Sequence, residues 1–267
     1  ATNSFFHELG ITAHVVGFDP DLPPPAIDQD SYDILFYMLG SAAYPEPYRI
    51  ENTSLRFLTC YLSYGVLLAD HPEFQFNSSF HHAAWRIFAN TQRERRLYDR
   101  YCRRTRGNAI NTGYPKFDLY QTTASQQSAS PTLIWAPHWA IGRISMNFGC
   151  FDRVCFEMLS VIDEFPQVDF VYRPHPNLKH ALAAIGAMTS ENYALYLKEL
   201  EARPNVRIHQ SGGNIALFCR SAGMITDSVS FLAEYLPTGR PLLFLERSDR
   251  DRLNEDGERI IALHYRG

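Results

Sequence analysis

Short runs of apolar, β-prone residues alternate with longer stretches of helical periodicity along the whole chain. The runs predict strands in two series, at 12–18, 33–39, 58–63, 86–90 and 109–112, and at 132–136, 168–172, 205–209, 222–226 and 241–245. The clearest helical patterns lie at 91–104, 145–165, 191–202, 214–220 and 229–236. Such alternation is typical of βαβ units around a mostly parallel sheet. The predicted fold class is therefore α/β.

A polar segment without periodicity separates the two series of strands. It covers residues 119–130 and reads LYQTTASQQSAS, which indicates a linker. We therefore predict an N-terminal Rossmann-like domain at 1–118 and a C-terminal one at 131–267. Residues 1–10 have the pattern of the end of a helix, so the first domain is expected to lack its first strand. After residue 245 the chain becomes polar, and no closing helix is expected there.

Charge and cysteine content narrow the class of function. The net charge is −4 and the pI about 6.2, so no nucleic-acid partner is expected. The basic stretch Arg93–Arg106 fits the solvated face of a helix better than a patch for an anionic polymer or a membrane surface. The five cysteines form no CxxC pair, which argues against disulfides and against a cysteine zinc site. No apolar run reaches the roughly 18 residues of a membrane span, so a cytoplasmic location is expected, with peripheral membrane association left open.

Polar residues of chemical interest follow three strands of the second series. His138 and Arg143 follow the strand at 132–136, and Arg173 and His175 follow the strand at 168–172. A turn rich in hydroxyl groups follows the strand at 222–226; its candidates are Thr226, Asp227, Ser228 and Ser230. Because ligands of open α/β sheets bind at the carboxyl ends of the strands, we expect these residues to meet in one cleft.

These residue types together suit a diphosphate. Hydroxyl residues at a helix start offer donors beside unpaired backbone N–H groups, and arginine grips phosphate oxygens with two bonds. A histidine either donates to phosphate or, when neutral, accepts a proton from a hydroxyl. Glu234, less than two turns beyond the helix start, is placed to accept hydrogen bonds from ribose hydroxyls. No pair of carboxylates has metal-binding spacing, so neither a metal nor a cofactor is expected.

Taken singly, the same residues have ordinary structural interpretations. The turn at 226–228 fits an N-cap cluster, His175 fits a rigid turn between prolines, and Arg143 fits a surface position. Only their joint placement after three strands of one series favours a functional site.

Several motifs occur in a fixed order between residues 111 and 245. They read NTGYPKFD at 111–118, LIWAPHW at 133–139, YRPHPN at 172–177, NIALFCRSAGMITDSVSFLAEY at 214–235 and GRPLLFL at 239–245. In this order they resemble the CDP-glycerol glycerophosphotransferase family, the teichoic-acid polymerases and primases of bacterial cell walls. The resemblance implies a GT-B-like fold, with two Rossmann-like domains and a cleft between them. Where that family often has a histidine-glycine turn, this chain reads Ser63-Tyr64-Gly65, and the family's TDYSS turn is TDSVS here.

The resemblance also implies a function. It implies a transferase that takes a CDP-linked donor and passes a polyol phosphate, such as glycerol phosphate, to a hydroxyl of a polysaccharide or lipid-linked acceptor, with release of CMP. It places Arg143 and Ser230 at the pyrophosphate, Glu234 at the ribose, and His138 and His175 near the transferred group as catalytic residues. The remaining donor-binding candidates are Arg173, Thr226, Asp227, Ser228 and Gly113. Two alternatives stay open: a GT-B glycosyltransferase or epimerase that uses a UDP-sugar, and a non-catalytic nucleotide-binding module of a larger polymer-synthesis protein.

Overall fold

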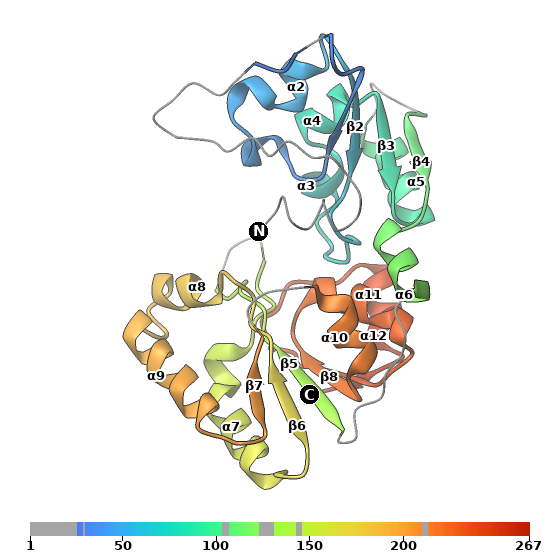
Figure 1. The fold of residues 1–267 in the computed structure, drawn as a ribbon. Coiled ribbons are helices and arrows are strands. Elements are labelled where there is room, and N and C mark those ends of the chain that lie inside the picture. The colour runs from blue at the N-terminus through green and yellow to red at the C-terminus, as the bar shows by residue number, and fades with distance from the viewer. Residues whose placement is uncertain (1–25, 29, 103–106, 123–130, 143–145, 210–212) are drawn as a thin grey trace.

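Two parallel β-sheets dominate the computed structural model of the chain, which describes residues 26–28, 30–102, 107–122, 131–142, 146–209 and 213–267 (Figure 1). The first sheet has the order β1-β2-β3-β4 and the second the order β10-β9-β8-β5-β6-β7. The strands of the first sheet are β1 (Ile34–Tyr37), β2 (Leu58–Leu62), β3 (Arg86–Ala89) and β4 (Ala109–Asn111). Those of the second are β5 (Thr132–Ala136), β6 (Asp169–Tyr172), β7 (Val206–Ile208), β8 (Gly223–Thr226), β9 (Leu242–Phe244) and β10 (Tyr265–Arg266). All neighbouring strands run parallel, which confirms the α/β class.

The strands follow the apolar runs of the sequence closely. Nine of them lie within two residues of a predicted strand at either end, and the prediction for 132–136 is confirmed in full. The predicted strand at 12–18 lies outside the described residues. The two-residue edge strand β10 was not predicted, because it is too short to show a period.

Helices cover both faces of the second sheet. On one face lie α7 (Phe151–Glu164), α8 (Leu178–Ala184) and α9 (Ser190–Glu201), and on the other α10 (Asn214–Arg220), α11 (Val229–Tyr235) and α12 (Glu255–Ile261). Successive side chains of the central strand β5 point to opposite faces of the sheet. Ile134 belongs to the core on one face and Trp135 to the core on the other, and both are buried. Burial on both faces explains why these strands are almost continuously apolar.

The helices of the first sheet gather on one face. They are α2 (Ile50–Thr53), α3 (Pro72–Phe76), α4 (Ser79–Ala83) and α5 (Gln92–Tyr101), and each contributes to one core with the sheet. Since the four strands lie in chain order and parallel crossovers are right-handed, the connections must return on the same side. The opposite face leaves Phe36, Leu58 and Ile110 exposed.

Three expectations about helices are wrong in part. The helix predicted at 145–165 begins only at Phe151, because the N–H groups of Phe148 and Gly149 turn back to the carbonyl of Ala140. The segment after 245 does contain a helix, α12. Asn254 caps this helix, because its side-chain oxygen accepts the N–H of Gly257 at 3.0 Å. The first residues of the predicted linker form α6 (Asp118–Thr122), and 123–130 lie outside the described residues.

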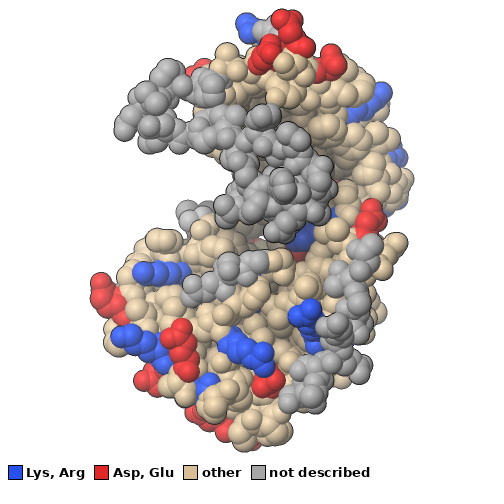
Figure 2. Space-filling model, in the orientation of Figure 1, with Lys and Arg blue, Asp and Glu red and all other residues tan. Residues whose placement is uncertain are grey.

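The basic stretch at 93–106 is described as far as Cys102. Within α5, Glu94 and Tyr98 are buried while Arg96 and Arg100 are exposed, and Arg95 pairs with Asp99 at 2.6 Å. This pattern fits a solvated helix face over the described part. Figure 2 likewise shows positive and negative side chains interspersed on the visible face of the molecule.

A loop of the first unit (described residues 26–122) enters the core of the second unit (131–267). Leu68 and Ala69, which follow β2, pack with Leu253 and other residues of the second unit's core. Asn254 reinforces this contact: its backbone N–H donates to the carbonyl of Leu68 at 2.8 Å and its amide to that of Leu67 at 2.6 Å. The two units therefore share packed side chains as well as a surface contact.

Candidate functional site

A cleft of about 290 Å³ lies between the two units, at the carboxyl edge of the second sheet. One wall comes from the residues that follow β5 and β6 and from the start of α11; the other comes from residues 64–69 and Gln75 of the first unit. Because β8, β5 and β6 are parallel neighbours, their carboxyl ends meet there. Six of the predicted site residues line the cleft: His138, Arg173, His175, Ser228, Ser230 and Glu234.

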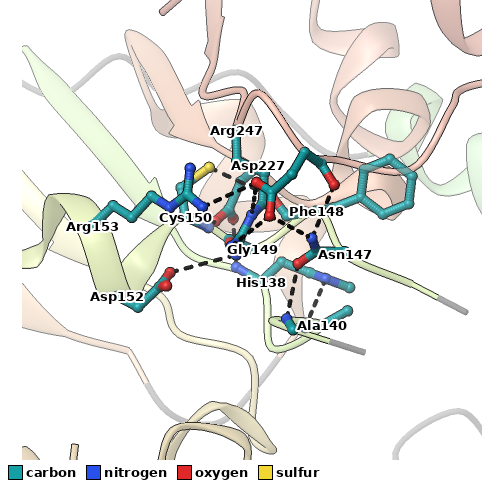
Figure 3. Close-up of polar contacts among 12 residues, drawn as sticks. His138, Ala140, Asn147, Phe148, Gly149, Cys150, Asp152, Arg153, Asp227 and Arg247 are labelled. Atoms are coloured by element: carbon teal, nitrogen blue, oxygen red, sulfur yellow. Dashed lines mark hydrogen bonds and ion pairs between the residues drawn. The ribbon is translucent and has the colours of Figure 1, made fainter. Parts of the chain in front are cut away.

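Asp227 holds the loop of the cleft wall in place through two backbone N–H groups (Figure 3). Its side chain is 1% exposed and accepts the backbone N–H of His138 on one oxygen and that of Cys150 on the other, both at 2.5 Å. Burial raises the pKa of this carboxyl to about 7, against the lowering effect of the two N–H groups. Asp227 thus ties the carboxyl end of β8 to both ends of the loop at 137–150.

Thr226 also faces inward. Its hydroxyl donates to the carbonyl of Ala136 at 2.6 Å and accepts the N–H of Ser228 at 3.0 Å. Neither Thr226 nor Asp227 lines the cleft, so their predicted contact with the donor stays a prediction. Their hydrogen-bonding groups are used within the protein, close to the N-cap role that the sequence also allowed.

The far part of the 137–150 loop is braced by the segment after β9. Arg247 donates to the carbonyl of Gly149 at 2.8 Å (Figure 3). The N–H of Asn147 donates to Asp251 at 2.7 Å. The side-chain oxygen of Asn147 accepts the N–H of Gly142 at 2.8 Å. Arg143, predicted to bind the pyrophosphate, lies outside the described residues.

His138 is buried and its ring is fixed. The ring Nδ1 accepts the N–H of Ala140 at 3.2 Å, and only 7% of the residue is exposed. Burial, aided by the neighbouring His175, lowers the pKa of His138 to about 3. The ring is therefore neutral at pH 7.

His175 lies beside His138, in the turn after β6. Its backbone N–H donates to the carbonyl of Pro137 at 3.1 Å, and its Nδ1 accepts the N–H of Asn177 at 3.1 Å. The centroid of its ring is 5.7 Å from that of His138 and 5.5 Å from that of Trp139. Burial and the charge of Arg173 lower the pKa of His175 to about 4, so this ring is also neutral at pH 7.

Arg173 brings a fixed positive charge to the same wall. Its Nε donates to the side-chain oxygen of Asn214 at 3.1 Å and its Nη1 to the carbonyl of Pro174 at 3.0 Å. These two bonds orient the guanidinium plane and leave Nη2 without a described partner. Burial lowers the pKa of Arg173, but an arginine keeps its charge at pH 7.

Ser228 and Ser230 lie where α11 begins. Both line the cleft, and neither hydroxyl has a hydrogen-bond partner among the described residues. Helix α11 has only seven residues, so its dipole is small. The polar contribution of this turn therefore comes mainly from the two hydroxyl groups.

Glu234 joins the two units at the edge of the cleft. Its carboxylate accepts the ammonium of Lys116 at 2.6 Å and lies 3.5 Å from the hydroxyl of Tyr114. Gly113 has a φ of +80°, which turns the chain toward Tyr114, but Gly113 does not line the cleft. Its role in this structure is conformational, and its predicted contact with the donor stays a prediction. A role for Glu234 at a ribose stays a prediction.

Three further residues of this site were not among the predicted ones. Trp139 and Asn214 line the cleft and stand inside motifs that the sequence showed, so the motif itself was the available signal. Lys116 also stands inside a motif, the one at 111–118, but nothing local marks its pairing with Glu234, because that partner is far away in the chain.

The sheets, their order and the cleft between the two units define a GT-B-like α/β protein. Solved structures share this fold. MnaA of S. aureus, solved with UDP, matches with a TM-score of 0.54 and 13% identity over 87% of this chain and 62% of that chain. A putative UDP-N-acetylglucosamine 2-epimerase from Listeria monocytogenes matches with a TM-score of 0.53 and 14% identity over 86% of this chain and 61% of that one.

The wall teichoic acid polymerase TagF also matches, with a TM-score of 0.47 and 15% identity over 71% of this chain and 49% of that one. The chain spans less than two thirds of the length of each of these three structures. No protein-family model and no curated protein sequence matches it.

Two features are absent from the part of the chain that the structure describes. No helix among them is both long and apolar enough for a membrane span. Within the same part of the chain, no three histidine, cysteine, aspartate or glutamate side chains are grouped so that they could hold a metal ion.

Proposed function

We propose that the chain is a transferase that moves a polyol phosphate, such as glycerol phosphate, from a CDP-linked donor to an acceptor hydroxyl. The observation that carries the proposal is the meeting of Arg173, His138, His175 and Ser230 on one wall of the interunit cleft. A guanidinium, two neutral imidazoles and free hydroxyls are groups that bind a diphosphate.

In the proposed reaction, the acceptor oxygen forms a bond to the β-phosphorus of the donor. The bond from that phosphorus to the bridging oxygen breaks, CMP leaves with the electron pair, and the hydroxyl proton passes to solvent or a base. Negative charge grows on the phosphate oxygens during this step. Donors that are already oriented, as Arg173 is by Asn214 and Pro174, stabilise that charge without further reorganisation.

The first unit supplies the acceptor side in this proposal. Its loop at 64–69 faces the second unit across the cleft, and Tyr64, 57% exposed, is the residue of that loop with a long polar side chain. A polysaccharide or lipid-linked acceptor from the cell wall or capsule fits the motif resemblance, as does attachment to the inner membrane surface. Arg143 completes the pyrophosphate site in this proposal.

A second candidate function is the use of a UDP-sugar, as in an epimerase. The observation in its favour is the fold: two of the structures that match with a TM-score above 0.5 are a putative UDP-N-acetylglucosamine 2-epimerase and MnaA solved with UDP. The same cleft groups serve either donor, because both contain a diphosphate. The base of the nucleotide therefore separates the two candidates.

Thermal unfolding with CDP-glycerol, CDP-ribitol, CMP, UDP and UDP-N-acetylglucosamine tests the proposal. A ligand at 100 times its Kd adds about 2.7 kcal/mol, which for a chain of this size raises the Tm by about 5–10 °C. We expect that shift with the cytidine compounds, together with release of CMP from CDP-glycerol when acceptor is present. Shifts with uridine compounds alone would favour the second candidate, and binding without turnover would favour a non-catalytic module.

Variants of the wall make the test specific. Ser230→Ala and Arg173→Ala are expected to reduce the nucleotide-induced shift. The matched controls Ser160→Ala and Arg220→Ala change exposed side chains on other surfaces and are expected to leave it unchanged. Equal shifts in all four variants would remove this wall from the donor site.

A further inference from the structure

The two histidines of the cleft use the same ring nitrogen in the same way. Nδ1 of His138 accepts the backbone N–H of Ala140 at 3.2 Å, and Nδ1 of His175 accepts that of Asn177 at 3.1 Å. A backbone N–H can only donate. Nδ1 of each ring must therefore present a lone pair and not a proton.

A neutral imidazole carries one proton, so in both rings this proton is on Nε2. Burial keeps both rings neutral at pH 7, since it lowers the pKa of His138 to about 3 and that of His175 to about 4. No described residue accepts a hydrogen bond from Nε2 of either ring, and both side chains line the cleft. The two N–H groups are therefore available to a ligand.

We propose that His138 and His175 act as a fixed pair of Nε2–H donors to one phosphate group, and that neither is the base that takes the acceptor's proton. A base must present a lone pair to the hydroxyl, and the lone pair of each ring is directed to the residue two positions further on. The ring centroids are 5.7 Å apart, which allows one phosphate to meet both rings. Arg173 adds the one positive charge of the described cleft lining. The inference rests on the proposed function only in taking the ligand to be a phosphate.

Nuclear magnetic resonance of the full chain with ¹⁵N-labelled histidine tests the protonation state directly. Couplings from the ring carbons' protons to the two nitrogens identify which nitrogen carries the proton, and the spectra of His138→Gln and His175→Gln assign the signals. We expect the Nε2–H form in both rings at pH 7. A proton on Nδ1, or on both nitrogens, in either ring would overturn the proposal. The exposed His180, which lies outside the cleft lining, serves as the control.

Binding of inorganic pyrophosphate tests the donor role. Glutamine places an amide N–H near the position of Nε2, whereas asparagine reaches only the position of Nδ1. We therefore expect His175→Gln to bind pyrophosphate within about threefold of the unchanged protein and His175→Asn about tenfold more weakly, the effect of one lost hydrogen bond to a charged group. His180→Asn, the matched control, is expected to leave binding unchanged.

Several results of this binding experiment count against the proposal. Equal weakening by Gln and Asn in variants that melt like the unchanged protein would show that the ring is needed for something other than an N–H donor. Absence of pyrophosphate binding by the unchanged protein would refute the phosphate ligand. Pyrophosphate binding with the expected variants but no response to any nucleotide would overturn the proposed function and leave this inference standing.

Discussion

Replacement of Asp227 by asparagine is the most direct test of how the cleft wall is held. The carboxylate accepts one backbone N–H on each oxygen, from His138 and from Cys150, and the group is almost fully buried. An asparagine has one oxygen and one NH₂ group, so in either orientation it turns an N–H donor toward another N–H donor. One hydrogen bond is lost and one buried donor is left without a partner, which costs about 1–3 kcal/mol. We expect Asp227→Asn to lower the free energy of unfolding by about 3 kcal/mol.

Urea unfolding followed by tryptophan fluorescence measures this change, because Trp135 is buried in the same unit. The control is Asp33→Asn, an exposed aspartate, for which we expect a change within about 0.5 kcal/mol. Amide hydrogen exchange gives the local readout: the N–H groups of His138 and Cys150 should lose protection in Asp227→Asn. An unfolding free energy within 0.5 kcal/mol of the unchanged protein, with both amides still protected, would refute the reasoning.

The effect of Asp227→Asn on the free energy of unfolding should depend on pH. The pKa of Asp227 is about 7 in the folded protein and near 3.8 in the unfolded chain. A raised pKa means that the contribution of this group to stability is fully present below about pH 3.8 and is lost as the pH rises through 7. The difference in stability between the unchanged protein and Asp227→Asn is therefore expected to shrink from pH 5 to pH 8. A difference that grows over this range would mean that the two N–H groups outweigh burial.

Three further predictions concern other parts of the structure. The side chains of the ion pair Lys116–Glu234 are 33% and 9% exposed. A double-mutant cycle with Lys116→Met and Glu234→Gln should give a coupling free energy of about 1–2 kcal/mol. A coupling near zero would contradict a structural link between the two units at this ion pair. A Cβ on Gly149 would lie 2.5 Å from Ile141 Cγ1 and 2.9 Å from the carbonyl oxygen of His138, so Gly149→Ala should cost about 1–3 kcal/mol in urea unfolding, whereas Gly213→Ala, with open space around it, should cost far less. Burial lowers the pKa of His81 to about 3, so its contribution to stability is present above pH 6.5 and is lost as the pH falls toward 3. The unchanged protein should therefore lose more stability between pH 7 and pH 4 than His81→Leu does. Equal losses in the two proteins would refute this prediction.

The sequence predicted the strands well because each one is short, apolar and bounded by polar turns. Helix α10 was predicted at its observed bounds because its apolar positions are spaced at helical intervals. The start of α7 was predicted too early. Apolar residues such as Met146 and Phe148 continue the helical pattern upstream, but tertiary contacts of Gly149 and Cys150 hold that segment in a loop.

The cleft was predicted in part. The strand ends identified His138, Arg173, His175 and the serines, because parallel strands place their carboxyl ends together. The roles of Thr226 and Asp227 could not be separated from those of Ser228 and Ser230, since a short polar turn does not show which side chains face inward. The pairing of Lys116 with Glu234 depends on how the units pack and has no counterpart in local sequence.

The entry of Leu68 and Ala69 into the neighbouring core bears on how the chain could be divided. A protease cut between residues 122 and 131 would leave two fragments that each need the other: one would expose an apolar loop tip, and the other would have a gap where that tip belongs. Such fragments should co-purify and melt together, and neither should be a useful substitute for the intact chain in a binding assay. Expression of the second unit alone would therefore need the 64–69 segment to be supplied with it.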